Sequence, residues 1–172
     1  LLCAYDLTGS ATSAATAWHV DGSPQMSVYL PMEGGAANAL LDYSGSDNDV
    51  DDQGTGAVWG ETSGFGGGGG YSFDHSANAY LEINGAMPAG AYTKTAWVYA
   101  DQINDCHNII SGDNSNAFWV TSSRLQAGHN GGWTTHVRDS VDFPLNAWTF
   151  VAVTFDGVNE MILYKNGNAV DS

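Results

Sequence analysis

The sequence contains very few basic residues. Among its 172 residues, only Lys94, Lys165, Arg124 and Arg138 oppose 19 acidic residues, and the formal net charge is −15. A surface with this charge repels nucleic acid phosphates and anionic lipid, so we exclude nucleic acid as a partner. An acid excess is typical of a salty or calcium-rich extracellular setting, although it also fits a surface that is merely solvated. We therefore expect an extracellular or cell-surface location.

Cysteine and long apolar segments are also scarce. The two cysteines, Cys3 and Cys106, are too few for a disulfide-built fold. They could form a disulfide with each other, bond elsewhere or stay reduced. No apolar run reaches membrane-spanning length, so we expect no membrane insertion. The chain begins at Leu1 without a signal peptide, as expected for a processed or partial chain.

Motifs for catalysis are missing as well. The glycine-rich segment 64–70 lacks the Lys and Ser/Thr that end a phosphate-binding loop, so we expect a structural loop there. No Gly-x-Ser-x-Gly motif occurs. The five histidines show neither His-x-x-x-His nor a cysteine at zinc spacing, and Cys106 and His107 point to opposite faces of a strand. A carboxylate pair is invisible to sequence, but we expect no enzyme activity.

Strand patterns, in contrast, cover much of the chain, and no long segment has helical periodicity. β-branched and aromatic residues, punctuated by Gly, Asn and Asp, predict strands at residues 28–30, 80–83, 95–100, 118–120, 148–155, 161–165 and 168–170. The dipeptide Asn166-Gly167 predicts a type I′ turn between the last two. Many short strands with regular turns predict an all-β sandwich or barrel.

Residues 1–23 differ from the rest. Strand-like runs at 1–6 and 16–20 flank a small, polar loop, and residues 21–24 have the composition of a linker. A hairpin of this length is too short to fold alone, so its partner strands must come from elsewhere. We therefore divide the chain into an N-terminal β-hairpin extension, residues 1–23, and a main domain, residues 24–172.

From residue 28 to 171 the order of motifs resembles the laminin-G-like (concanavalin A-like) jelly roll found in bacterial or archaeal surface proteins. The motifs lie at residues 30–34, 42–49, 71–74, 79–83, 95–99, 108–111, 145–157 and 163–167. The resemblance implies an antiparallel two-sheet jelly-roll sandwich. Residues 1–23 resemble the last hairpin of an immunoglobulin-like repeat. Relatives usually carry one further strand, which is absent before Ser172, so we expect either that the sequence given ends early or that this strand is supplied from outside.

The resemblance also implies a structural calcium ion. Its ligands would be an acid that ends the first strand and groups of the loop that follows, here Glu33, Ser44, Asp47, Asn48 and Asp49. A loop dense in Asp, Asn and carbonyl groups supplies the oxygen ligands that calcium prefers. The last-strand Asp that usually completes the site is absent, and an acidic loop without an ion stays an alternative.

Glycan binding is the usual function of this fold, through exposed aromatic rings surrounded by hydrogen-bonding side chains. Trp97 and Trp148 match core positions of the family and should be buried. The candidates in the Gly-rich half are Trp119, Arg124, His129, Asn130, Trp133 and Arg138. Trp133 ranks first because two glycines precede it, although Trp119 and Trp133 also fit ordinary packing roles.

These observations predict a non-catalytic, calcium-stabilised binding or adhesion module of a larger surface protein, with a glycan or cell-surface polysaccharide as its partner. The glutamates do not form the Glu-x-Asp-x-x-Glu strand motif of glycosidases with this fold. The alternative is a structural subunit of an extracellular filament, in which neighbouring copies of the chain exchange strands. An unpaired hairpin at one end and an absent strand at the other favour that alternative.

Overall fold

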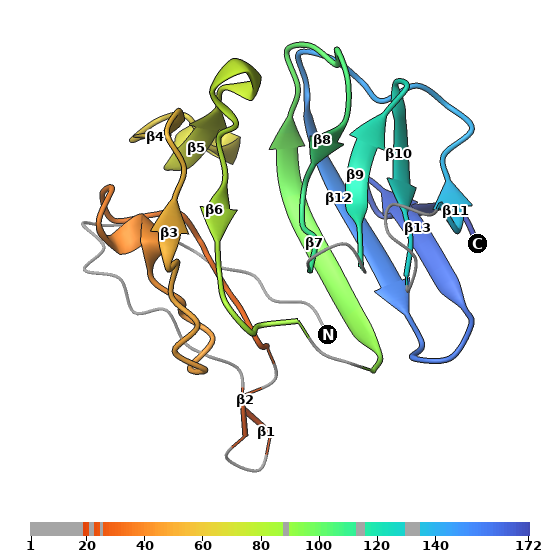
Figure 1. Ribbon diagram of the computed structural model, residues 1–172, viewed down its shortest axis with the longest axis horizontal. Coiled ribbons are helices and arrows are strands. Elements are labelled where there is room, and N and C mark those ends of the chain that lie inside the picture. Colours follow the sequence, from red (N-terminus) through yellow and green to blue (C-terminus); the bar gives the residue numbers. More distant parts are fainter. Residues whose placement is uncertain (1–18, 21–22, 25, 88–89, 113–115, 130–134) are drawn as a thin grey trace. The chain divides into compact units, whose positions relative to one another are not determined.

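A computed structural model of the chain describes residues 19–20, 23–24, 26–87, 90–112, 116–129 and 135–172. These residues divide into two compact units, residues 1–86 and 87–172, and each is described by itself (Figure 1). Antiparallel strands dominate both units. The helical elements among the described residues are short 3-10 turns at Asn38–Leu40, Phe65–Gly67 and His75–Ala77. No helix in the described ranges is long and apolar enough to cross a membrane.

The first unit contains short two-stranded ladders. β1 (His19–Val20) pairs with β2 (Ser23–Pro24), β3 (Asp52–Gln53) with β6 (Leu81–Glu82), and β4 (Ala57–Gly60) with β5 (Gly70–Phe73). The strand predicted at 28–30 is wrong, because its backbone bonds to a loop instead of to a neighbouring strand. Tyr29 donates its N–H to Asp42 Oδ1 over 2.8 Å and accepts from the Tyr43 N–H over 2.9 Å.

The second unit consists of two four-stranded antiparallel sheets. One has the order β14–β13–β12–β7, with strands Asn168–Asp171, Met161–Lys165, Trp148–Phe155 and Tyr92–Tyr99. The other has the order β11–β10–β9–β8, with strands Val137–Arg138, Arg124–Ala127, Phe118–Thr121 and His107–Asn108. β7 and β12 pair without a break from Tyr99↔Trp148 to Tyr92↔Phe155. The sequence predictions at 148–155 and 161–165 coincide with β12 and β13.

The two sheets of the second unit share one hydrophobic core. Phe118 and Leu125 contribute from one sheet, and Val151, Val153 and Leu163 contribute from the other. Each of these side chains is at most 1% exposed. Inward residues recur at every second position because successive side chains of a strand point to opposite faces. The predicted all-β antiparallel sandwich is confirmed.

The same alternation corrects the expectation for Trp97. Tyr92, Lys94 and Ala96 face the core from β7, so Trp97 must face outward, and it is 45% exposed. Its ring centroid lies 5.5 Å from that of Phe150 on the neighbouring strand. Trp148, also expected to be buried, is only half-buried and pairs in the same way with Tyr99 at 5.7 Å. These aromatic pairs stabilise the β7–β12 ladder on its outer face.

Two hairpins of the second unit have turns in which both central residues adopt the left-handed backbone conformation, with positive φ. The predicted type I′ turn is confirmed: Asn166 has φ +50° and Gly167 φ +80°, between the paired residues Lys165 and Asn168. The β9–β10 hairpin has the same form without its usual residues. Ser122 has φ +47° and Ser123 φ +61°. Serine adopts this conformation at an energetic cost and is not a usual residue of such turns, so the residue types at 122–123 do not predict the turn.

We therefore expect the double substitution Ser122→Asn and Ser123→Gly to raise the free energy of unfolding by about 1 kcal/mol. Asn and Gly occupy left-handed positions with less strain than serine. Urea denaturation followed by circular dichroism measures the change. Ser140→Gly is the control, because Ser140 does not have a positive φ and a glycine there only adds chain entropy. A higher free energy of unfolding for Ser140→Gly, or no increase for the double substitution, would contradict the argument that Ser122 and Ser123 are strained.

Candidate functional site

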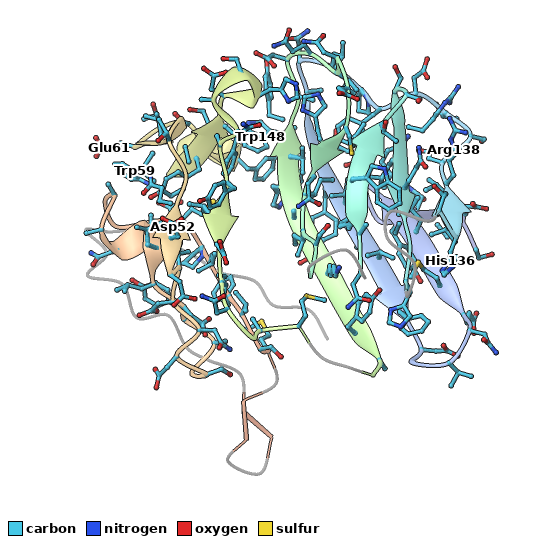
Figure 2. The ribbon with its side chains drawn as sticks, in the orientation of Figure 1. Asp52, Trp59, Glu61, His136, Arg138 and Trp148 are labelled. Carbon is cyan, nitrogen blue, oxygen red and sulfur yellow. The ribbon has the colours of Figure 1, made fainter. Side chains whose placement is uncertain are left out.

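The outer face of the β8–β11 sheet carries a row of polar and aromatic side chains. Phe118 and Val120 face the core, so Trp119 between them faces outward. The register pairs Asn108 with Trp119, Trp119 with Gln126, and Gln126 with Arg138. One residue from each strand therefore lies at the same level of the sheet. Arg138 ends this row on β11, the strand at the edge of the sheet (Figure 2).

A pocket of about 610 Å³ opens on this face. Its lining consists of three members of the row, Asn108, Trp119 and Gln126, together with Cys106, Thr121 and Thr135. The volume falls within the range of roughly 300–1,000 Å³ that is typical of small-ligand pockets. An aromatic ring beside several hydrogen-bonding groups is the usual composition of such a site. We take this pocket as the candidate functional site.

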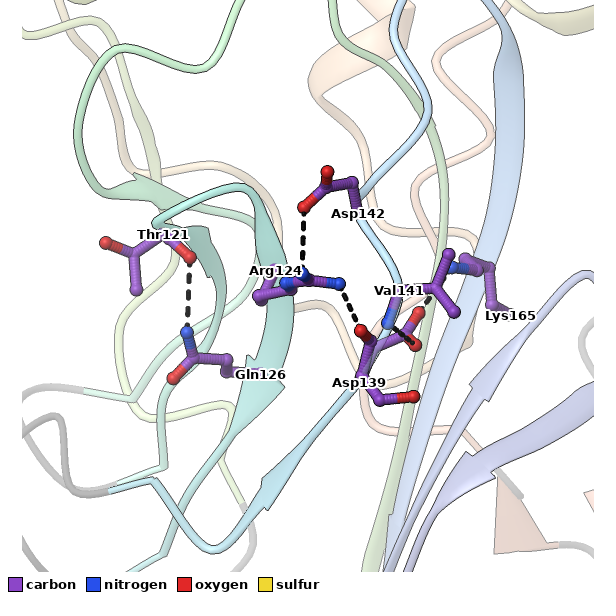
Figure 3. Close-up of polar contacts among 8 residues, drawn as sticks. Thr121, Arg124, Gln126, Asp139, Val141, Asp142 and Lys165 are labelled. Atoms are coloured by element: carbon purple, nitrogen blue, oxygen red, sulfur yellow. Dashed lines mark hydrogen bonds and ion pairs between the residues drawn. The ribbon is translucent and has the colours of Figure 1, made fainter.

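Two hydrogen bonds hold the side-chain amide of Gln126 in the pocket. Its side chain is buried, and its amide Nε2 donates to the Thr121 carbonyl over 3.2 Å (Figure 3). Its Oε1 accepts the Thr135 hydroxyl over 2.6 Å. These two bonds fix which end of the amide is donor and which is acceptor. A primary amide has a second N–H and a second lone pair, so Gln126 can serve a ligand in a set orientation.

The structure places Trp119 in the pocket lining but corrects its expected exposure. Only 2% of its surface is accessible, so it is not a projecting platform. Asn130 and Trp133 lie outside the described residues, and their assignment stays a prediction. The sequence analysis missed Asn108, Thr121, Gln126 and Thr135. Thr121 could have been found from the sequence, because it lies two residues after Trp119 on β9 and therefore on the same face of the sheet. Asn108, Gln126 and Thr135 come close to Trp119 only through the pairing of strands.

The remaining glycan candidates do not line the pocket. The Arg124 guanidinium donates to the Ser140 carbonyl and lies 3.2 Å from Asp142 Oδ1 (Figure 3). The Arg138 side chain is exposed, and its backbone N–H donates to Asp171 Oδ2 over 2.6 Å.

His129 belongs to a different cluster. Its ring stacks on Phe155 at 4.0 Å, and its Nδ1 lies 3.4 Å from the Tyr92 hydroxyl. Burial lowers the pKa of His129, and the charges of His136 and Lys94 lower it further. This histidine therefore packs against members of the core and does not contribute to the pocket.

In the first unit, Asp42 organises the loop that was expected to bind calcium. Its carboxylate accepts the Tyr29, Ser44 and Asn48 N–H groups and the Ser44 hydroxyl. Burial alone raises the pKa of Asp42, but these donors more than compensate and leave it below its ordinary value. Ser44 is fully buried, and Asp49 Oδ1 accepts the Asp42 N–H over 2.7 Å. Internal donors therefore satisfy the central carboxylate of this loop.

The other expected calcium ligands lie as follows. Glu33 accepts the Gly69 N–H at both carboxylate oxygens over 3.1 Å, in contact with the glycine-rich segment. Asp47 is exposed with φ +55°, and the Asn48 amide donates to the Ser27 carbonyl over 2.7 Å. Among the described residues, no group of three or more His, Cys, Asp or Glu side chains is placed to hold a metal ion. The calcium site stays a prediction.

Cys106 lies at the pocket and is exposed. Burial of the thiol, and next the charge of Asp105, raise its pKa. Cys3 lies outside the described residues, so a disulfide between the two cysteines is untested.

The two antiparallel sheets around one core define an all-β sandwich class of domain. The family model described as the concanavalin A-like lectin/glucanases superfamily matches residues 66–172, well over half of the chain, and the chain belongs to this superfamily. No curated protein and no solved structure gives a match. The family match excludes residues 1–65, so the immunoglobulin-like resemblance and the boundary after residue 23 stay predictions.

Proposed function

We propose that this chain is a non-catalytic carbohydrate-binding module of an extracellular or cell-surface protein. The observation that carries the proposal is the pocket on the β8–β11 sheet, where Trp119 lies among uncharged hydrogen-bonding side chains. Membership of a superfamily named for lectins and glucanases is consistent with a sugar ligand.

The chemistry of the lining suits a sugar. Sugars offer many hydroxyl groups that donate and accept hydrogen bonds, and C–H faces that contact aromatic rings. Asn108 and Gln126 bring amides, and Thr121 and Thr135 bring hydroxyls. The amide of Gln126 is already oriented by its two protein partners, so a ligand need not order it on binding.

A binding role is favoured over hydrolysis by the type of residue in the lining. Glycosidases generally place two carboxyl groups on either side of the scissile bond. The described residues that line the pocket include neither Asp nor Glu. The strongly negative net charge supports an extracellular setting for the module.

Removing one hydroxyl from the pocket tests the proposal. A glycan array first identifies a bound sugar, and calorimetry then compares its affinity for Thr121→Val and for the unsubstituted chain. We expect Thr121→Val to weaken binding about tenfold, because a ligand hydroxyl loses its partner while the side-chain volume is kept.

Thr154→Val is the matched control for this experiment. Thr154 is also half-buried, and it lies on β12 of the other sheet. The control should bind as tightly as the unsubstituted chain. Equal losses in the two variants, or an array on which no glycan binds, would contradict the proposed pocket.

A further inference from the structure

We propose that the pocket selects neutral sugars and rejects acidic ones such as uronates and sulfated sugars. This inference rests on the proposed function and deepens it by naming the ligand class. It depends on where the few cations of the chain lie, and on the charge of the pocket lining.

The described residues of the lining offer no charged partner. Their side chains are an indole, two amides, two hydroxyls and one thiol. An anionic ligand group placed among them would lose its water shell without gaining a cation, which is strongly unfavourable. A hydroxyl in the same place needs only the hydrogen bonds that these side chains supply.

Three of the four basic residues of the chain make contacts away from the pocket. The structure describes all four. Lys94 is 5% exposed on the core side of β7, and its ammonium donates to the Ile110 and Asn116 carbonyls. Lys165 pairs with the buried Asp139, and Arg124 with Asp142.

Arg138 is the remaining cation. It stands beside Gln126 in the outer row, but it is not part of the lining. Its exposed guanidinium is solvated, and a single screened cation compensates little for the net charge of −15. Both the local chemistry and the overall field therefore disfavour an acidic ligand.

Paired sugars that differ only in charge provide the test. The probes are oligosaccharides of galactose and of galacturonic acid, and N-acetyllactosamine with and without 6-sulfate. Calorimetry gives affinities at low and high salt. Alkylation of Cys106 by iodoacetamide in the Cys3→Ser chain reports occupancy of the pocket, because Cys106 is at the pocket and Cys3 is the other cysteine.

We expect at least one neutral probe to bind and to slow the alkylation of Cys106. Its acidic partner should bind at least about tenfold more weakly at both salt concentrations, because salt does not screen desolvation inside the pocket. An acidic probe that binds as tightly as its neutral partner would overturn the inference while leaving sugar binding intact. Loss of the discrimination at high salt would also overturn it, since only the long-range field would then be at work.

A second, independent test places a positive charge in the pocket. Asn108→Lys should improve binding of the acidic probe about tenfold. Asn168→Lys adds the same charge at an exposed position of β14 and should not improve it. If Asn108→Lys and Asn168→Lys improve the affinity for the acidic probe equally, the selectivity depends on net charge and not on the pocket lining. If no glycan of the array and no probe of either kind binds or protects Cys106, the proposed function itself fails, and this inference fails with it.

Discussion

Asp139→Ala is expected to lower the free energy of unfolding by about 3–5 kcal/mol, because it leaves the ammonium of Lys165 without its partner. Asp139 is 2% exposed and follows β11, whereas Lys165 ends β13 of the facing sheet (Figure 3). The same carboxylate accepts the Val141 N–H over 2.8 Å. The pair therefore joins the two sheets through a buried carboxylate and a lysine whose side chain is 15% exposed. Urea denaturation followed by tryptophan fluorescence measures the loss.

Asp142→Ala is the matched control for this change. Asp142 also pairs with a cation, Arg124, but its side chain is 72% exposed. Water solvates both charges when such a pair breaks, so we expect a loss of less than about 1 kcal/mol. Removing both buried charges in Asp139→Leu with Lys165→Met should recover much of the stability. Comparable losses for Asp139→Ala and Asp142→Ala would show that the buried pair has no special role.

The second large effect concerns Lys94. Its side chain lies in the core beside the Tyr92 ring, and burial lowers the pKa of Lys94 from 10.5 to about 8. Below pH 8 the ammonium is charged in both states, and the folded chain bears the cost of burying it. Between pH 8 and 10.5 the unfolded chain still holds the proton that the folded chain has released. Stability should therefore rise across this window, by about 3 kcal/mol for this group alone.

Comparison with Lys94→Met isolates the contribution of this lysine. His129, which faces it, has a pKa lowered from 6.5 and titrates below the window, whereas Tyr92, whose pKa burial raises from 10.0, is present in both chains, so its contribution cancels in the comparison. Cys106 titrates in both chains alike. Urea denaturation at several pH values between 8 and 10.5 gives the free energy of unfolding of each chain. This free energy should rise with pH more steeply in the unsubstituted chain than in Lys94→Met. Parallel curves for the two chains would refute the assigned burial of the ammonium.

The sequence predicted the β12–β13–β14 meander because every local signal there agrees. Alternating apolar residues mark β12 and β13, and Asn166-Gly167 fixes the turn that follows. β10 escaped prediction because Arg124 and Gln126 interrupt its apolar pattern and two serines form its turn. Lys94 is the clearest local exception, since a cation occupies an inward position of β7. Tertiary carbonyl partners, which no local pattern reveals, satisfy its ammonium.

The candidate site was only partly predictable for a similar reason. Trp119 was identified as a ligand residue from its type and its region, but its burial follows from the fold. Asn108 and Gln126 join Trp119 only through cross-strand register, which pairs residues far apart in the chain. Asp142 and Ser140, which follow β11, engage the Arg124 guanidinium, a contact that no local pattern reveals, and the role of Arg124 as a ligand residue stays a prediction.

The row of Asn108, Trp119, Gln126 and Arg138 has a consequence for how such a domain diversifies. Neighbouring strands lie about 4.8 Å apart, so the row spans about 14 Å across the sheet. Each member is flanked along its strand by residues that face the other way. Substitutions in the row can thus change the chemistry of the outer face one strand at a time, without replacing the neighbouring residues that form the core.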